Sequence, residues 1–238
     1  MQSEYLARLS EPVQEFIREV EQRANLYINV ILDPQQNEGG PTGQGHLAVV
    51  INARHIQLFA PTDGYFPDGA VRHEVLHVQR FHIEGVPKLT LADEEKWDKG
   101  FSDALGALDN AMEHVAIVPL ELQFHPERRE HWEAVMSKVW SDFPSVPDDE
   151  RHLAACLHWT FLRHVLPGSP QIQIARNLLN VYALLEKADD FANQFLSVAD
   201  RKEEMVRFVF LTFPEIGKNR AALEYISSTT GTRQMPIP

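Results

Sequence analysis

The sequence predicts an α+β fold, in which a small N-terminal antiparallel or mixed sheet packs on one helix and a helical C-terminal half follows. Two observations support this class. Runs rich in β-branched residues and bounded by turn residues occupy residues 26–32 and 47–60. From residue 68 onward, apolar residues recur at helical spacing instead. We expect a core over residues 1–120 and a helical region over residues 121–238, which can also form one continuous domain with it.

The N-terminal half is predicted to alternate helices with short strands. Ser10 is a candidate cap, and Pro12 suits the first turn, of a helix whose apolar residues are Val13, Phe16, Ile17 and Val20. The glycine-rich residues 37–45 are interpreted as a hairpin connection, and residues 47–60 as one or two further strands. A helix over residues 68–81 follows, with Asp68 as its expected cap.

The C-terminal half is predicted to be helical, with capping residues and prolines as boundaries. Pro119 is expected to end one helix, Asp148 to cap another and Pro167 to end it. The expected helices cover residues 101–118, 127–140, 149–166, 172–185, 191–198 and 202–213. The last twelve residues, SSTTGTRQMPIP, are expected to be loose or only weakly docked.

The composition is that of a globular protein, with 44% hydrophobic and 24% charged residues. Acidic residues outnumber basic ones by 34 to 22, which argues against broad binding of nucleic-acid backbones. No run approaches the roughly 18 apolar residues of a membrane span, and the first residues lack the apolar segment of a secretory signal. The single cysteine, Cys156, cannot form an internal disulfide. We therefore expect a cytoplasmic protein with no membrane partner.

The stretch Val71-Arg-His-Glu-Val-Leu-His-Val78 carries the chemistry. His73 and His77 are four residues apart, so on a helix both imidazoles project from one face and can reach a single Zn²⁺. Glu74 is one residue further round and can accept a proton from water at the open position of the metal. This is the H-E-x-x-H arrangement of zinc peptidases. The alternative is a core helix whose histidines satisfy buried carbonyl groups.

A catalytic zinc needs a third protein ligand, which a second helix should supply. Asp109 and Glu113 lie one turn apart beside an apolar stripe, and buried carboxylates need a cation or hydrogen-bond donors. We predict Glu113 as the ligand and Asp109 as the acceptor for the free N–H group of a zinc-bound histidine, with the two roles exchangeable. His114 is the competing ligand. The two acids can also be solvated surface residues.

Further predictions concern residues outside this motif. Tyr65 or Tyr182 is a candidate donor to the oxyanion of a tetrahedral intermediate, although each is more often a packed aromatic residue. Cys156 shares a helix face with Leu153, Leu157 and Phe161, which predicts a buried small side chain. The alternative is a thiolate that blocks the open position of the metal.

The motif His73-Glu74-x-x-His77, followed by the segment Leu108-Asp-Asn-Ala-Met-Glu-His-Val-Ala-Ile-Val-Pro119, resembles gluzincin-type metallopeptidases. The size and the small sheet before the zinc helix further resemble the bacterial ImmA/IrrE peptidases and the CapP peptidases of CBASS anti-phage operons. The resemblance covers residues 28–119 and implies a zincin-like core. It also implies cleavage of a transcriptional repressor, often of helix-turn-helix type, and a response to single-stranded DNA.

The sequence thus predicts a zinc-dependent endopeptidase with a specific protein substrate in a bacterial stress or anti-phage pathway. Residues 47–58 are the expected edge strand for pairing with a substrate chain. The alternative function is a metal-stabilised binding or regulatory protein without catalysis, which would not need Glu74. A peptide deformylase or another amidohydrolase would share the motif, but we find no upstream cysteine-containing ligand motif.

Overall fold

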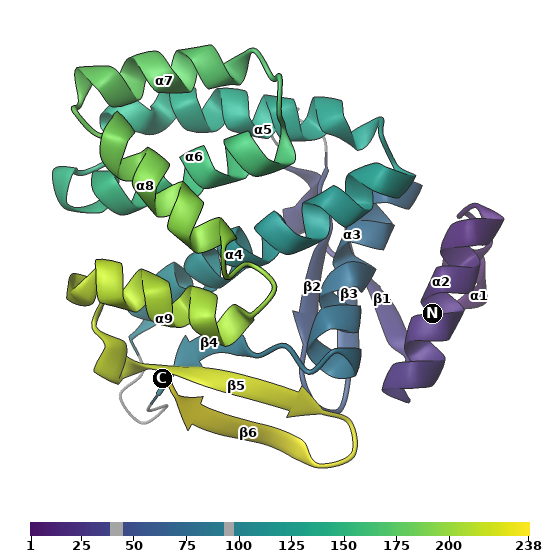
Figure 1. Cartoon of the computed structure of the whole chain (residues 1–238). Coiled ribbons are helices and arrows are strands. Elements are labelled where there is room, and N and C mark those ends of the chain that lie inside the picture. The colour runs from purple at the N-terminus through teal and green to yellow at the C-terminus, as the bar shows by residue number, and fades with distance from the viewer. Residues whose placement is uncertain (39–44, 93–97) are drawn as a thin grey trace. The chain divides into compact units, whose positions relative to one another are not determined.

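The computed structural model describes residues 1–38, 45–92 and 98–238 (Figure 1). It combines many helices with two small sheets, which confirms the predicted α+β class. The chain divides into two compact units. The first consists of Met1–Lys88, Gln123–Pro126 and Glu224–Gln234, and the second of Leu89–Leu122, Glu127–Leu223 and Met235–Pro238.

The first unit contains a mixed three-stranded sheet, as predicted. Its strands are β1 (Ile28–Leu32), β2 (Ala48–Ile51) and β3 (Ile56–Ala60), in the order β1-β3-β2. β3 is parallel to β1 and antiparallel to β2. Residues 37–45 therefore join two strands that are not neighbours, so the expectation of a hairpin connection was wrong. Most of that segment, residues 39–44, lies outside the described residues.

Helices α2 (Glu11–Ala24) and α3 (Asp68–Val78) share one apolar core with this sheet. The predicted apolar face of α2 is confirmed, because Val13, Ile17 and Val20 are each at most 2% exposed. On α3, Val71, Val75 and Val78 belong to the same cluster. Burying a side chain of this size stabilises the fold by about 1.5–3 kcal/mol, so this packing fixes the position of α3 against the sheet.

The start of α3 differs from the expected capping. Pro67, not Asp68, is the N-cap residue, and Asp68 is the first helical residue. The Asp68 carboxylate instead accepts a hydrogen bond from the Ser10 backbone N–H, with distances of 3.1 and 3.3 Å to its two oxygens. Ser10 is the N-cap residue of α2, as predicted, but its side chain makes no capping bond. Asp68 therefore joins the beginnings of two helices.

Short helical segments complete the N-terminal part of the chain. α3 continues into a turn of π-helix over Gln79–Ile83. A short helix, α1 (Ser3–Leu6), precedes α2, and a 3₁₀ turn, Pro34–Asn37, follows β1.

The predicted helical C-terminal half is confirmed. Its helices are α4 (Lys99–Phe124), α5 (Arg128–Asp142), α6 (Asp148–Val165), α7 (Gln171–Val181), α8 (Leu185–Leu196) and α9 (Lys202–Thr212). Short 3₁₀ turns lie at Phe143–Ser145, Pro214–Ile216 and Lys218–Arg220. Within the described ranges, none of the helices combines the length and apolar character that a bilayer crossing requires.

Pro119 does not end its helix, contrary to the prediction. α4 continues for another turn beyond it, to Phe124. A proline inside a helix removes one backbone hydrogen bond, which disfavours the helix by about 3 kcal/mol. Val115, Ile117 and Val118 are each at most 3% exposed, and their tertiary packing outweighs this local preference.

Three other helix boundaries in this half were also wrong. The N-cap of α6 is Pro147, so Asp148 lies inside the helix rather than capping it. The predicted helix over residues 172–185 ends earlier, at Val181, and the next helix begins at Leu185 rather than at residue 191. Ala183 breaks the run between them, because its φ of 54° is left-handed and cannot continue a right-handed helix.

The end of the chain is ordered, which corrects the expectation of a loose tail. β5 (Ala221–Ser227) and β6 (Gly231–Pro236) form a second sheet with β4 (Lys88–Leu91), in the order β4-β5-β6. Gly231, with φ of 83°, occupies the turn before β6, where a left-handed residue is needed.

Candidate metal site

Helix α3 places the histidine pair as the spacing predicts. The ring centroids of His73 and His77 are 5.1 Å apart and their planes meet at 81°. Each residue is only 6% exposed. The valines on the buried side of α3 anchor the helix in the core, so the two imidazoles occupy a fixed face. Glu74 lies between them in sequence and is half-buried.

Phe81 supports the second histidine of the pair. Its ring stacks on His77, with 6.0 Å between the centroids and 22° between the planes. Phe81 is itself 4% exposed and belongs to the apolar core of the first unit. One face of the His77 ring therefore rests on a rigid support, which reduces the entropy that the ring would lose on binding a ligand.

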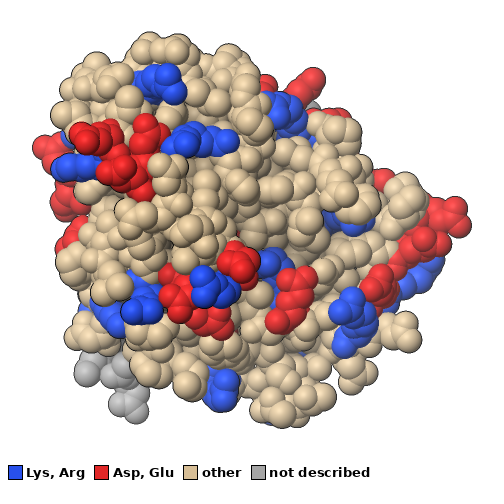
Figure 2. Space-filling model, in the orientation of Figure 1, with Lys and Arg blue, Asp and Glu red and all other residues tan. Residues whose placement is uncertain are grey.

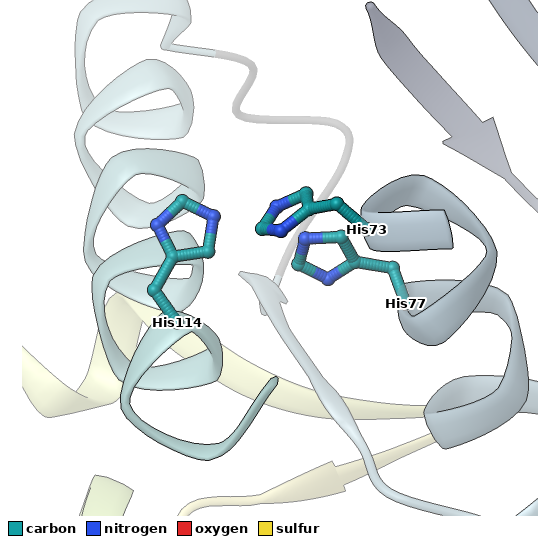
Figure 3. Close-up of side chains that lie close together, drawn as sticks. All are labelled: His73, His77 and His114. Carbon is teal, nitrogen blue, oxygen red and sulfur yellow. The ribbon is translucent and has the colours of Figure 1, made fainter. Parts of the chain in front are cut away.

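His114, from α4, completes a group of three histidines (Figure 3). One ring nitrogen from each of His73, His77 and His114 lies within 4.8 Å of the other two. Nitrogens that share one tetrahedral zinc ion are about 3.3 Å apart, because each Zn–N bond is about 2.0–2.1 Å. The group is thus close to the required spacing, and its three imidazoles could hold a metal ion. Neutral imidazoles suit zinc, copper, iron and nickel.

The predicted third ligand, Glu113, forms an ion pair with a lysine. Its Oε1 atom lies 2.7 Å from Nζ of Lys202, the first residue of α9. Asp109, predicted to orient a histidine, lies 2.8 Å from the same Nζ atom and also accepts a hydrogen bond of 3.0 Å from the Leu89 backbone N–H. Buried carboxylates need a cation or hydrogen-bond donors, and the ammonium group of Lys202 is such a cation.

The burial of this ion cluster is nearly complete. Lys202 is 3% exposed, Asp109 6% and Glu113 1%. Burial raises the pKa of Asp109, and the attraction of Lys202 only partly offsets this. Burial alone would lower the pKa of Lys202, but the two carboxylates outweigh burial and raise that pKa. The lysine therefore stays charged and holds the acidic face of α4 against the start of α9.

Sequence reasoning considered His114 only as a competing ligand, and it missed Lys202. His114 lies off the acidic stripe of its helix, and residue spacing alone therefore favours Glu113. No local signal identifies Lys202, which is 93 residues from Asp109 along the chain.

Arg72, beside the histidine pair in sequence, is stacked between two aromatic rings. Its guanidinium carbon lies 4.3 Å from the ring centroid of Phe16 and 3.9 Å from that of Phe124. The residue is 8% exposed, and its Nε atom has no hydrogen-bond partner within the described ranges. Burial lowers the pKa of Arg72. Cation–π attraction compensates part of the desolvation of this charge.

The other candidate residues from the sequence are Tyr65, Tyr182 and Cys156, and each packs within the fold. Tyr65 packs against the apolar core of the first unit. Tyr182, in the second unit, contacts the ring of Phe143 and the guanidinium group of Arg151. Cys156 is fully buried, as predicted, and burial raises the pKa of its thiol to about 12. At neutral pH it is therefore a thiol, which argues against the alternative of a thiolate ligand.

Charged residues of both signs are mixed over the face drawn in Figure 2. Several lysines and arginines pair with an acid one helical turn away, as in Arg23–Glu19, Lys99–Asp103 and Lys138–Asp142. Such pairing reduces the positive potential that phosphate backbones need for tight binding.

Comparison of the chain with protein families, with curated proteins and with solved structures gives no match.

Proposed function

We propose that the protein is a zinc-dependent peptidase in which His73, His77 and His114 hold the metal and Glu74 acts as the general base. The observation that supports this most directly is the convergence of three imidazole nitrogens within 4.8 Å, with a carboxylate next to one of them on α3. Three protein ligands leave one position of a tetrahedral zinc ion open, which is the arrangement of catalytic rather than structural zinc sites.

The metal and Glu74 have separate roles in this proposal. A zinc ion in such a site supplies Lewis acidity and makes water acidic enough to act as a nucleophile near neutral pH. Glu74 takes one proton from the attacking water as its oxygen bonds to the peptide carbonyl carbon. As the C–N bond breaks, Glu74 returns that proton to the leaving amine, so that the products are a carboxylate and a free amino group.

The edge strand β2 supports a peptide as the substrate. β2 pairs with β3 on one side, and no strand in the described ranges pairs with its other side. The same strand contacts α3 within the first unit. A substrate chain in extended form can hydrogen-bond to an open strand edge by β-augmentation. Of the predicted residues 47–58, only β2 supplies this edge, because β3 is central in the sheet.

The opposite edge of the same sheet is already occupied. The side-chain amide of Gln2 donates to the Val30 carbonyl and accepts from the Val30 N–H, at 2.9 Å in both cases. It therefore makes both of the hydrogen bonds that a neighbouring strand would make to Val30. Since β1 is protected in this way, β2 is the edge of this sheet that favours an added chain.

We extend the proposal to a specific protein substrate, such as a helix-turn-helix repressor in a bacterial stress or anti-phage pathway. The motif resemblance supports this part. Single-stranded DNA as a regulator has the same basis, and the net charge of −12 limits any such contact to a local surface.

Metal analysis tests the ligand set. Purified wild type should contain about one zinc ion per chain, and each of the variants His73→Ala, His77→Ala and His114→Ala should lose most of it. Glu113→Gln is the matched comparison on α4. Stoichiometric metal in His114→Ala together with its loss in Glu113→Gln would reject our ligand set in favour of the glutamate.

The variant Glu74→Gln tests catalysis separately from metal binding. The amide keeps the size of the side chain but cannot accept the proton, so zinc content should be unchanged while cleavage is lost. A diverse peptide library, analysed by mass spectrometry for new termini, provides the substrate. Equal cleavage by wild type and Glu74→Gln would contradict the peptidase mechanism. A zinc-loaded wild type that cleaves neither the library nor a panel of helix-turn-helix repressors would favour the non-catalytic alternative.

A further inference from the structure

The surroundings of His114 contain a second buried network, which the proposed mechanism does not use. The imidazole of His114 lies edge-to-face against the indole of Trp132 on α5, with 4.9 Å between ring centroids and 69° between planes. Trp132 is 5% exposed. On its other sides the indole contacts Phe161 at 5.4 Å and His131 at 5.3 Å between centroids.

The indole is oriented by a buried carboxylate. Its Nε1–H group donates a hydrogen bond of 2.9 Å to Oε2 of Glu121. The other oxygen of Glu121 accepts from Nε of Arg128 at 2.5 Å. Glu121 is fully buried, so both of its bonds lie where water competes weakly. A charge-assisted bond at one end and a packed ring at the other leave the indole little rotational freedom.

Helix geometry connects this network to the third histidine. Glu121 follows His114 on α4 by seven residues, which places both on the same face two turns apart. Trp132 spans these two turns, with its Nε1–H on Glu121 and its ring on His114. The orientation of the His114 ring is therefore tied to a carboxylate on its own helix.

We propose that Trp132 and Glu121 are positioning residues for the His114 ligand, an inference that rests on the proposed function. A metal ligand is effective when its ring is already oriented, and neighbours that orient ligating histidines typically change metal affinity by roughly 10–100-fold. Here packing against an anchored indole limits the ring orientations of His114. Metal binding then requires less ordering of that imidazole.

Zinc affinity and the visible absorption of the cobalt-substituted protein test this inference. Trp132→Phe and Glu121→Ala should each weaken zinc binding by about tenfold and change the cobalt ligand-field bands, which report the geometry of the ligands. Trp159→Phe is the matched control. Trp159 is also buried and donates its Nε1–H to a carboxylate, that of Asp189, at 2.7 Å, but it does not contact His114. This variant should keep wild-type zinc affinity and bands.

Glu121→Gln separates positioning from general stability. Its amide oxygen can still accept the indole N–H, while the ion pair with Arg128 is lost. Unfolding by urea should show lower stability for this variant, yet its cobalt spectrum should match wild type. If Glu121→Ala and Trp132→Phe do not fold, fluorescence provides the test, because bound cobalt should quench Trp132 and remove the same absolute intensity from wild type and from Trp159→Phe.

The outcomes distinguish the two proposals. Wild-type affinity and bands in both Trp132→Phe and Glu121→Ala, with zinc lost in His114→Ala, would overturn the positioning role and leave the metal site standing. Absence of cobalt and zinc binding in wild type would overturn the metal site, and the positioning inference with it. In the fluorescence test, full zinc binding without any quenching by cobalt would count against the contact between Trp132 and His114.

Discussion

The Nζ atom of Lys202 lies 2.7 Å from Oε1 of Glu113, and both residues are almost completely buried. The acidic residues that were expected to bind a metal thus have a lysine as their counter-ion. A metal site and an ion cluster both place carboxylates beside an apolar stripe, and sequence spacing alone does not distinguish them.

Removing this lysine charge should strongly destabilise the protein. Lys202→Met leaves Asp109 and Glu113 buried without their cation, and breaking such a pair costs about 3–5 kcal/mol in the free energy of unfolding. Lys99→Met is the matched control, because Lys99 pairs with Asp103 at 2.6 Å while 77% of its side chain is exposed. The control should change stability by less than about 0.5 kcal/mol. Urea denaturation of both variants measures the difference, and equal stability would contradict the importance of burial.

Replacing the stacked Arg72 even by lysine should destabilise the protein. Arg72→Lys keeps the charge but loses the planar group that lies between Phe16 and Phe124, so we expect a loss of about 1–2 kcal/mol in unfolding free energy. A double-mutant cycle with Phe16→Leu should give a coupling energy of about 0.5–2 kcal/mol. Arg18→Lys, an exposed substitution on the same helix as Phe16, is the control. Additive effects of the Arg72 and Phe16 substitutions would show that the stacking contributes nothing.

Stability should fall in mildly acidic solution because of His158. Burial lowers the pKa of His158 from 6.5 to about 4. Between these two pH values the unfolded chain binds a proton at His158 and the folded chain does not. The free energy of unfolding is therefore highest above pH 6.5 and decreases as the pH falls toward 4. When the pH reaches the folded pKa, this difference lowers the free energy of unfolding by about 3 kcal/mol.

His158→Gln should flatten this part of the pH dependence, measured as urea unfolding at a series of pH values. The exposed His55 provides the control variant, His55→Gln, which should keep the wild-type slope. Burial also lowers the pKa values of His82, His152 and His164, so some slope of the same sign should remain. A slope in His158→Gln equal to that of wild type would rule out His158 as a contributor.

The single thiol should be unreactive in the folded protein. Cys156 is fully buried, and its pKa of about 12 leaves almost no thiolate near neutral pH. A thiol reagent such as Ellman's should label native protein only as fast as it unfolds, and should label denatured protein at once. Rapid labelling of native protein, with zinc affinity decreasing in proportion to the fraction labelled, would support Cys156 as a metal ligand.

Local signals explain how much of the fold could be predicted. The apolar faces of α2 and α3 and the strands of the first sheet follow from periodicity, because each of these elements buries one side against the same core. The i, i+4 spacing of His73 and His77 likewise fixed their common face. Pro119 was misjudged because a local cost was outweighed by packing, which single-sequence patterns do not contain.

Distant contacts explain what could not be predicted. Lys202, which pairs with Glu113, comes from α9, and strand β5 pairs with β4 from much earlier in the chain. Short strands carry little periodicity, although the glycine at residue 231 was a turn signal within the tail. The choice between Glu113 and His114 depends on how α4 is rotated about its axis, and Lys202 takes part in setting that rotation.

The amide of Gln2 also affects how copies of the protein can associate. Strand edges with unpaired backbone groups can join molecules into long sheets when both edges of a sheet are open. Here the Gln2 side chain occupies the outward-facing backbone groups of Val30 on one edge of the first sheet, so an incoming strand meets fewer open backbone groups there than at β2. When copies meet through β2, this arrangement favours a pair of molecules over a growing fibre.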